Sequence, residues 1–317
     1  MIVRWSLGEL PVVLAEVGVE APIQVASRRA GAAVDLPLAG VWAEVPSDRI
    51  EVAPAADGLL AVGGGSAIDT AKAASAATGL PLVSVPTTYA GAEWAPSFGI
   101  RDANRRLVGG GGGARLAGIV YEVSLTLGLP RAETVGTALN ALAHCAEALY
   151  GERSNRSDAC ALAGAELIGL WLPRVVETPA DPVARDGLLH GAAAAGEALG
   201  LAGLALAHAI AQALGGTFGL PHGAMNALAL PAALRYNAAF VPEAVARFGQ
   251  ALGAGDDPAA RVEQLAALGG FRRLRDFGVP AAELPAVAET AAGRTGNRRN
   301  PHPASAREIE ELLRSIY

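Results

Sequence analysis

The sequence predicts a two-domain protein in which an α/β N-terminal domain with a parallel sheet is followed by an all-α C-terminal domain. Up to residue 129, short apolar runs alternate with glycine turns and helical patterns, an order typical of parallel α/β sheets. From residue 130 onward, prolines separate long segments rich in Ala and Leu, which indicates successive helices. The 317 residues, 51% of them hydrophobic, suffice for two such domains, over 1–129 and 130–317.

The N-terminal domain is expected to contain one strand for each of its short apolar runs, at residues 23–26, 40–45, 58–62, 81–85 and 119–121. A helix is predicted over 67–78, soon after the third of these runs. Residues 1–57 are short for such a domain and show no convincing first strand. The low-complexity run 109–113 consists of glycines and is expected to form a flexible loop.

The C-terminal domain is expected to consist of helices at residues 131–151, 156–176, 183–214, 224–237, 241–252, 258–276, 281–292 and 304–316. The most apolar stretch, 198–216, is long enough to raise the question of a membrane span. His208 and Gln212 interrupt it, and Ala and Gly dominate it, so we expect a buried helix instead.

Composition excludes several classes of function. The net charge of −6 argues against a nucleic-acid partner, because such proteins present a basic face to the phosphates. Two cysteines do not make a disulfide framework, and the first twenty residues contain no apolar signal-peptide region. We therefore expect a cytoplasmic protein that acts on a small molecule and contacts neither nucleic acid nor membrane.

A glycine turn lies between the third apolar run and the helix that follows it. Glycines let the backbone approach a ligand closely, and a helix N-terminus attracts negative charge. The turn therefore suits a pyrophosphate, although a plain capped turn with Ser66 as the N-cap is the alternative. Asp69 and Lys72 follow three residues apart and share one helix face. The residues of this predicted cofactor site are Gly63, Gly64, Gly65, Ser66, Asp69 and Lys72.

Two threonines, Thr87 and Thr88, follow the next apolar run in the same way. Strands of a parallel sheet end at one edge, where the ligand crevice lies. The two hydroxyl groups are therefore predicted to bind a phosphate or a ribose beside the glycine turn.

Histidines mark a second predicted site. Asn140 and His144 lie four residues apart on one predicted helix face, and His208 lies on another helix. His222 begins a further helix. Together they predict a cluster that binds a divalent metal or relays protons, the alternative being separate core or cap histidines. His190 and His302 are expected to be structural or peripheral.

Four segments resemble signatures of the iron-containing alcohol dehydrogenase superfamily, and most closely its maleylacetate reductase-like branch. They are GGGSAIDTAK at 63–72, PTTYAGAEW at 86–94, ALNALAHCAEALY at 138–150 and GLALAHAIAQALGGTFGLPHG at 203–223. The resemblance implies a dehydroquinate synthase-like fold and an NADH or NADPH cofactor between the two domains. It also implies a homodimer. The reaction that it implies is the reduction of an activated double bond or a carbonyl group of a small dicarboxylate substrate.

The resemblance further implies a role for each matching residue. Gly63 to Ser66 would hold the pyrophosphate with support from Asp69 and Lys72, and Thr87 and Thr88 would line the nucleotide site. The catalytic residues would be His144, His208 and His222. The same histidines and Asn140 match the positions that bind Fe²⁺ or Zn²⁺ in metal-dependent members.

Departures from the signatures affect the metal and the substrate. Asn140 stands where metal-dependent members have Asp, which removes a negative charge; maleylacetate reductases resemble this chain in having Asn there. Arg115, Arg298 and Arg299 are candidates by position for holding a dicarboxylate. The alternatives are a metal-dependent alcohol or polyol dehydrogenase, a biosynthetic enzyme without hydride transfer, and a non-catalytic binding module.

Overall fold

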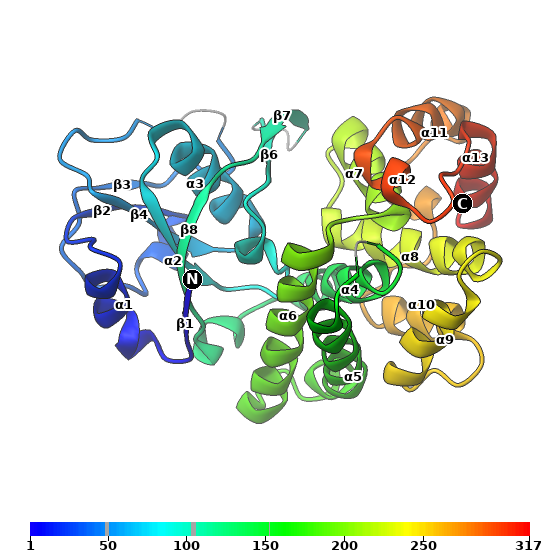
Figure 1. Ribbon diagram of the computed structural model, residues 1–317, viewed down its shortest axis with the longest axis horizontal. Coiled ribbons are helices and arrows are strands. Elements are labelled where there is room, and N and C mark those ends of the chain that lie inside the picture. Colours follow the sequence, from blue (N-terminus) through cyan, green and yellow to red (C-terminus); the bar gives the residue numbers. More distant parts are fainter. Residues whose placement is uncertain (48–50, 103–105, 152) are drawn as a thin grey trace. The chain divides into compact units, whose positions relative to one another are not determined.

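The computed structural model describes residues 1–47, 51–102, 106–151 and 153–317, except for the side chains of residues 28 and 29. The chain divides into two compact units, Met1–Gly128 and Leu129–Tyr317 (Figure 1). The first unit contains a parallel sheet and the second is helical, so the predicted fold class is confirmed.

The sheet of the N-terminal unit has the strand order β1-β8-β5-β4-β2-β3, and every pairing in it is parallel. Its strands are β1 (Ile2–Arg4), β2 (Pro22–Ala26), β3 (Gly40–Trp42), β4 (Gly58–Gly63), β5 (Pro81–Pro86) and β8 (Arg115–Val120). The expectation of no first strand was wrong, because β1 pairs with β8 through the register Ile2↔Gly118. Its three residues are too few to show an alternating pattern.

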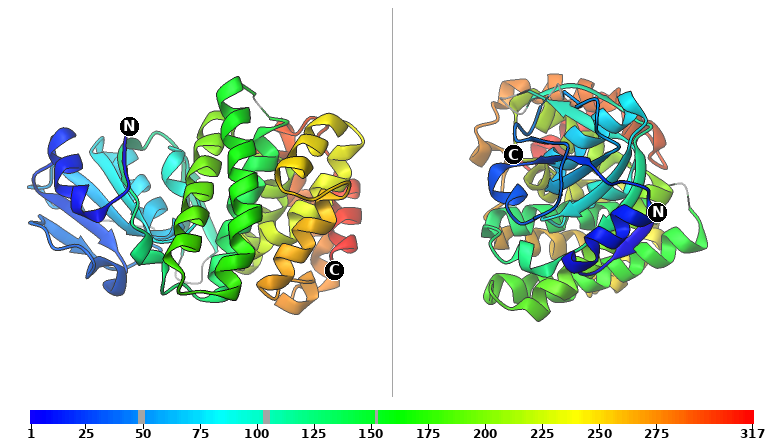
Figure 2. Two further views of the ribbon diagram at one scale, coloured as in Figure 1. Left: turned by 90° about the horizontal axis from the view of Figure 1, so that it is seen from below. Right: turned by 90° about the vertical axis from the view of Figure 1, so that its left-hand side faces the viewer.

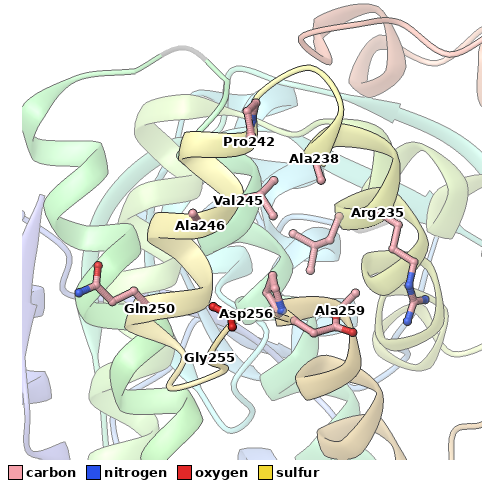
Figure 3. A pocket seen from close by; sticks show the side chains of 12 residues that line it. Arg235, Ala238, Pro242, Val245, Ala246, Gln250, Gly255, Asp256 and Ala259 are labelled. Carbon is pink, nitrogen blue, oxygen red and sulfur yellow. The ribbon is translucent and has the colours of Figure 1, made fainter.

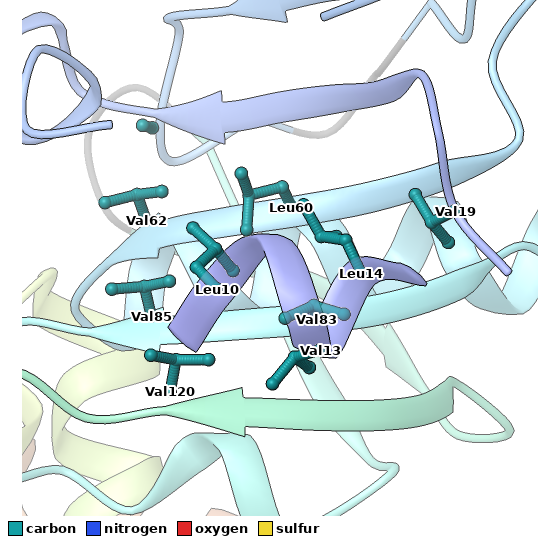
Figure 4. Packing of buried hydrophobic residues seen from close by; sticks show 10 residues of the cluster. Leu10, Val13, Leu14, Val19, Leu60, Val62, Val83, Val85 and Val120 are labelled. Atoms are coloured by element: carbon teal, nitrogen blue, oxygen red, sulfur yellow. The ribbon is translucent and has the colours of Figure 1, made fainter. Parts of the chain in front are cut away.

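Alternate residues of each strand face opposite sides of the sheet and produce two hydrophobic layers. On one side α1 (Leu10–Glu16) covers the strands, and Figure 4 shows its Leu10 and Leu14 facing Leu60 and Val83. On the other side α3 (Gly65–Thr78) packs its apolar residues against the intervening strand residues. The sheet is thus buried on both faces, as parallel sheets are.

A two-stranded antiparallel ribbon stands apart from the main sheet. It consists of β6 (Phe98–Arg101) and β7 (Leu107–Gly111). The prediction of a loop over residues 109–113 was wrong for 109–111, which pair with β6. Backbone hydrogen bonds and close packing on Phe98 hold these glycines, and a Cβ at Gly110 would meet the carbonyl oxygen of Phe98 at 2.9 Å.

The C-terminal unit consists of helices α4 (Arg131–Ala148), α5 (Asn155–Glu177), α6 (Pro182–Ala202), α7 (Leu206–Phe218), α8 (His222–Ala238), α9 (Pro242–Ala251), α10 (Pro258–Leu268), α11 (Leu284–Ala292), α12 (Thr295–Arg299) and α13 (Ala306–Ser315). The helix α2 (Arg28–Gly31) and several short 3₁₀ turns complete the chain. Helices α5 and α6 run side by side, as Figures 1 and 2 show from different directions.

Two expected helices end earlier than the apolar pattern indicates. The segment 183–214 is broken after Ala202, because Gly203 adopts a positive φ of 77° and ends α6 before α7 begins. The segment 258–276 stops at Leu268, where Gly269 and Gly270 follow, the latter with φ 81°. Glycine in this conformation is a common helix end.

Among the described residues, one helix, α5, is long and apolar enough to cross a membrane, and α6 with α7 would be a second only as a pair bent by 100°. Within its unit α5 packs against α4 and α6. Core helices of globular domains have the same length and composition.

Candidate active site

The glycine turn lies at the edge of the sheet where the strands end. Strand β4 ends at Gly63, which has φ 154°, and α3 begins at Gly65. The N-cap is Gly64, which offers no side chain to the first turn, so Ser66 lies inside the helix and is not its cap. No side chain of the N-cap residue therefore accepts from the backbone N–H groups of the first turn of α3. Uncapped N–H groups at a helix N-terminus suit an anion.

Space around the turn differs from one glycine to the next. A Cβ at Gly64 would meet Thr88 Cγ2 at 2.8 Å, and one at Gly63 would meet Ala67 Cβ at 2.9 Å. At Gly65 the nearest atom would be Ala92 Cβ at 4.0 Å. Gly63 and Gly64 thus serve the packing of the turn itself, while Gly65 leaves room for a ligand against the backbone.

The structure brings the second predicted element to the same turn. The backbone N–H of Thr87 donates to the carbonyl oxygen of Gly63 at 3.0 Å, and the side chain of Thr88 packs beside Gly64. Thr88 is 9% exposed. The two threonines and the glycine turn therefore form one continuous surface, and its residues fit a nucleotide phosphate.

Lys72 and Asp69 connect this surface to the segment that follows it. The Lys72 ammonium group is buried and lies 2.8 Å from Asp69 Oδ1. It also donates to the carbonyl oxygens of Ala92, Ala95 and Ser97 at 2.8, 3.2 and 2.6 Å. Because these acceptors use all three ammonium protons, Lys72 supports the loop rather than reaching for a phosphate.

Glu93 in the same loop was not singled out by the sequence. It is buried, and the Tyr121 hydroxyl donates to its Oε1 at 2.7 Å. Trp94 Nε1 donates in turn to the Tyr121 oxygen at 2.7 Å. Burial raises the pKa of Glu93 above its ordinary value, despite the opposing effects of these hydrogen bonds and of Lys72.

The three predicted histidines of the C-terminal unit do come together. The rings of His144 on α4 and His208 on α7 are stacked, with centroids 4.7 Å apart and planes 13° apart. The ring of His222, at the start of α8, lies 5.7 Å from that of His208 at 50°. His144 and His208 are 3% and 1% exposed, so both imidazoles are removed from bulk water.

Glu147 orients His208 and was missed by the sequence reasoning. Its Oε2 lies 2.7 Å from His208 Nδ1, and it accepts backbone N–H groups from Ala205 and His208 at 2.7 and 3.1 Å. Because the carboxyl group accepts from Nδ1, the other ring nitrogen, Nε2, carries the lone pair. The signal was present, since Asn140, His144 and Glu147 are spaced to share one face of a helix.

Asn226 is a second missed residue. It is fully buried on α8, and its Nδ2 donates to Asn140 Oδ1 at 2.6 Å and approaches His222 Nε2 at 3.1 Å. Its spacing of four residues from His222 again places both on one helix face. The amide group therefore joins α4 to the start of α8 within the cluster.

Burial and neighbouring imidazoles define the electrostatics of the cluster. Loss of hydration, followed by repulsion from His208 and His222, lowers the pKa of His144 well below its ordinary value. His144 is thus a neutral imidazole near pH 7. Nδ1 of His144, Nε2 of His208 and Oδ1 of Asn226 are buried and have no hydrogen-bond partner among the described residues. Buried polar atoms without a partner in the protein are candidates for contact with a ligand.

The cluster does not fit a divalent metal. Among the residues that the structure describes, no three His, Cys, Asp or Glu side chains are grouped in a way that could hold an ion. The rings of His144 and His208 are nearly parallel, whereas imidazoles that bind one ion direct their in-plane lone pairs to a shared point about 2.1 Å away. Asn226 Nδ2 already engages Asn140 Oδ1 and His222 Nε2, atoms of two of the residues that were expected as ligands.

The remaining candidates lie elsewhere. His190 is half-exposed, with its Nε2 3.7 Å from Asp186, and exposed His302 stacks on Phe240. Arg115 begins β8 and so lies at the sheet edge opposite the glycine turn. Arg298 donates to Gly293 and Thr295 on the surface, and Arg299 lies beside Gly203, near the start of α7.

A surface cavity of about 640 Å³ in the C-terminal unit contains none of these residues. It lies between α8, α9 and the start of α10, and Figure 3 shows Arg235, Val245 and Asp256 around it. Arg235 is paired with Glu263 at 2.6 Å. The lining of this cavity contains no histidine and no residue of the histidine cluster.

Comparison with families of known proteins supports the sequence signatures. Residues 134–317 match the C-terminal part of the Fe-containing alcohol dehydrogenase family, and residues 47–112 match the iron-containing alcohol dehydrogenases. Maleylacetate reductase of Burkholderia cepacia is 36% identical over 263 residues, covering 83% of this chain and 74% of that protein. Maleylacetate reductase of Sphingobium indicum is 38% identical over 261 residues, covering 81% and 73%.

Solved structures share the fold over the whole chain. A putative alcohol dehydrogenase from Ralstonia eutropha superimposes with a TM-score of 0.89 at 33% identity, covering 100% of this chain and 95% of that one. Maleylacetate reductase from Agrobacterium tumefaciens superimposes with a TM-score of 0.87 at 29% identity, with the same coverage. Both units of the chain thus have counterparts in proteins of this kind.

Proposed function

The chain belongs to the iron-containing alcohol dehydrogenase family and is an NAD(P)H-dependent oxidoreductase, and from this premise we propose that it is a maleylacetate reductase. Its substrate class would be a small dicarboxylate in which a carbon–carbon double bond is conjugated to a ketone. The relatives named maleylacetate reductase support this choice.

The observation that carries the proposal is the make-up of the histidine cluster, which suits a proton donor better than a divalent metal. Asn140 replaces a charged ligand, and His208 presents Nε2 from a ring fixed by Glu147. Reduction of an aldehyde by a metal-dependent member would need an ion to polarise the carbonyl. A conjugated ketone needs only hydrogen-bond donors for its oxygen and a proton for one carbon.

The glycine turn and the threonines would hold the nucleotide. The backbone at Gly64, Gly65 and Ser66 would bind the pyrophosphate, with Thr87 and Thr88 beside it, while Lys72 and Asp69 keep the adjoining loop in place. When bound, the reduced nicotinamide supplies a hydride to the double bond and leaves as NAD(P)⁺.

His208 would supply the proton that completes the reduction. Hydride addition to one carbon of the double bond moves the electron pair into an enolate, whose charge lies mainly on the oxygen. His208, whose Nδ1 is held by Glu147, would first take up a proton from water at Nε2 and then donate it to the carbon next to the ketone. The ring then returns to its neutral form, so the sum is substrate, NAD(P)H and H⁺ giving saturated ketone and NAD(P)⁺.

Substrate and assembly complete the proposal. Arg299, beside the start of α7, is the arginine that we propose to contact a substrate carboxylate. We also propose that the protein is cytoplasmic and, as the family resemblance implies, a homodimer. Light scattering of the purified protein tests the dimer.

The experiment follows the absorbance of NADH and of NADPH with maleylacetate after dialysis against a chelator. We expect turnover that added Fe²⁺ or Zn²⁺ does not raise. Simple aldehydes and polyols serve as the comparison substrates. The enzyme would instead be a metal-dependent alcohol dehydrogenase if it converted the aldehydes or polyols only with added metal and did not reduce maleylacetate.

A further inference from the structure

Glu93 lies beside the predicted phosphate site and has a buried carboxyl group that the proposed reduction does not use. It belongs to a short 3₁₀ turn, Ala92–Trp94, and is 2% exposed. Its neighbour Ala92 faces the glycine turn, since a Cβ at Gly65 would lie 4.0 Å from Ala92 Cβ. The position of this 3₁₀ turn therefore decides how much space a phosphate has at Gly65.

Side chains of α3 and of the segment after β8 hold this 3₁₀ turn. Lys72 of α3 donates to the carbonyl oxygen of Ala92 at 2.8 Å. From the other side, the Tyr121 hydroxyl donates to Glu93 Oε1 at 2.7 Å. That hydroxyl has a single proton, and its oxygen accepts from Trp94 Nε1 at 2.7 Å. The carboxyl group of Glu93 thus ties the 3₁₀ turn to the end of β8.

Glu93 is buried beside a lysine whose charge is already used. The Lys72 ammonium group pairs with Asp69 at 2.8 Å and also donates to three backbone carbonyl oxygens. Glu122, on the segment after β8, directs its carboxyl group to backbone N–H groups instead. Burial raises the pKa of Glu93, against the lowering effects of its hydrogen bonds and of Lys72. Burial therefore favours the neutral form of this carboxyl group.

Ionisation of Glu93 would affect the phosphate site in two ways. It would place a negative charge on the residue next to Ala92, and a phosphate at Gly65 would be repelled by that charge. A buried carboxylate also requires hydration, which works against the packing of the 3₁₀ turn beside the glycine turn. Both effects weaken the binding of an anion, so the neutral carboxyl group is the form that supports binding.

We propose that Glu93 is a positioning residue for the nucleotide, which in its neutral form holds Ala92–Trp94 beside Gly65 and in its ionised form weakens phosphate binding. The proposal rests on the proposed function, because it concerns the nucleotide that the reaction uses. Since the effects of two ligands on each other are reciprocal, a bound nucleotide favours the protonated carboxyl group. Binding should therefore take up protons at a pH where Glu93 is partly ionised.

The first test observes the carboxyl group and needs no ligand. Infrared spectra of wild type and of Glu93→Gln are compared from about pH 5 to about pH 8, a range in which exposed carboxyl groups are mainly ionised. We expect the difference to contain a protonated carboxyl band that fades as pH rises. The absence of this band throughout the range would overturn the proposal, whether or not the enzyme reduces maleylacetate.

The second test measures NAD⁺ binding by isothermal titration calorimetry over the same pH range, in buffers of different ionisation enthalpy. The pyrophosphate of NAD⁺ keeps its charge in this range, so a change in affinity reports on the protein. We expect the Kd of wild type to rise about tenfold with pH, the effect of one added charge near the phosphate, and protons to be taken up on binding. Glu93→Gln should keep the low-pH Kd throughout. The same pH dependence in both proteins would overturn the proposal.

Two further variants separate the carboxyl group of Glu93 from other titrating groups. Tyr121→Phe removes a hydrogen bond that favours the ionised carboxyl group, so the rise in Kd should move to higher pH. A move to lower pH would overturn the proposal. Glu20→Gln is the matched control, because it removes an exposed carboxyl group before β2, at the sheet edge opposite the glycine turn. It should follow wild type at every pH.

The outcomes separate this proposal from the proposed function. A wild type that binds NAD⁺ with the expected pH dependence but leaves maleylacetate unreduced would refute the proposed function alone. An enzyme that reduces maleylacetate, but whose Kd for NAD⁺ does not change with pH, would refute the role of Glu93 alone.

Discussion

At the scale of single residues, the chemistry depends on pairs in which one side chain fixes another. Glu147 fixes the ring of His208 and at the same time receives two amide protons at the start of α7. The pair lies on two helices and is buried, so the ring of His208 keeps one orientation. A carboxyl group behind an imidazole commonly serves this purpose.

His208→Ala should lower kcat by about 100-fold or more while leaving the Kd of NAD(P)H nearly unchanged, because the proton donor is lost and the nucleotide surface is intact. Steady-state kinetics and fluorescence titration measure the two effects. His302→Ala is the control, since that ring is exposed and stacks on Phe240. Equal kcat values for the two variants would remove His208 from the mechanism.

Glu93 predicts a specific dependence of stability on pH. Because burial raises its pKa in the folded state, the folded chain holds this proton at a pH where the unfolded chain has lost it. Its contribution to stability is present at low pH and is lost as pH rises through the folded-state pKa. Glu93→Gln keeps an acceptor for Tyr121 but cannot ionise.

The free energy of unfolding of Glu93→Gln, relative to wild type, should therefore be larger at about pH 8 than at about pH 5. Urea unfolding at the two pH values measures it. A difference that is constant, or that shrinks at the higher pH, would show that the buried carboxyl group carries no such cost.

Residue spacing anticipates part of the site. The histidines were predicted because they interrupt helices that are otherwise nearly apolar, and Glu147 shares a helix face with His144. The contact between Asn226 and Asn140 joins residues 86 positions apart. Such a contact depends on how α4 packs against α8, and no local pattern reports it. Lys72 was predicted to support the cofactor site, and its ammonium group donates to three backbone carbonyl groups of the segment 92–97, contacts that the sequence pattern does not reveal.

At the scale of elements, the ends of strands and helices form the predicted cofactor site. Strand β4, its glycine turn and α3 form in sequence order because an apolar run, glycines and an Ala-rich segment follow one another. The order strand, turn, helix could be predicted from the sequence. The start of α3 at Gly65 could not, because Ser66 is the better N-cap by residue type. The broken helix after Ala202 and the β6–β7 ribbon were also missed, since glycines decide both.

Gly65→Ala should weaken NAD(P)H binding about tenfold, because the added Cβ occupies the space where a phosphate approaches the backbone. The fold should hold, since that Cβ meets no atom of the protein closer than 4.0 Å. Gly128→Ala is the matched control, as its Cβ would have nothing within 4 Å. Unchanged affinity in Gly65→Ala would contradict the phosphate assignment.

The residue after β2 is expected to affect the preference between NADH and NADPH. Ala26 of β2 pairs with Val62 of β4, so Ser27 lies beside the glycine turn, at the place where an acidic residue holds the ribose hydroxyl groups of NAD. Ser27→Asp should shift the ratio of kcat/KM values toward NADH by about tenfold through that added carboxylate. Since Ser27 caps α2 through Ala30 and Asp caps helices equally well, the fold should be kept.

Ser305→Asp is the control for this change, because Ser305 is likewise an N-cap, of α13 in the other unit. It should leave the NADH to NADPH ratio as in wild type. If Ser27→Asp also kept the wild-type ratio of kcat/KM for NADH to that for NADPH, the ribose would have to lie away from β2.

At the scale of the whole molecule, the chain assigns two tasks to two compact units. In our proposal, the parallel sheet of Met1–Gly128 would carry the surface for the nucleotide phosphates, and the helices of Leu129–Tyr317 would carry the proton donor. The sequence predicted this division because strand–glycine–helix order and long Ala-rich helices differ so clearly. Family membership supplies the reaction that joins the two tasks, hydride transfer from a reduced nicotinamide.

The most direct measurement of this account follows the hydride itself. Metal-free enzyme is given maleylacetate with NADH or NADPH carrying deuterium at the transferred position, and the product is analysed by mass spectrometry and NMR. We expect one deuterium on the former double bond, at the carbon farther from the ketone, and a solvent proton at the nearer carbon. Enzyme that binds the nucleotide but leaves the product without deuterium would contradict the account.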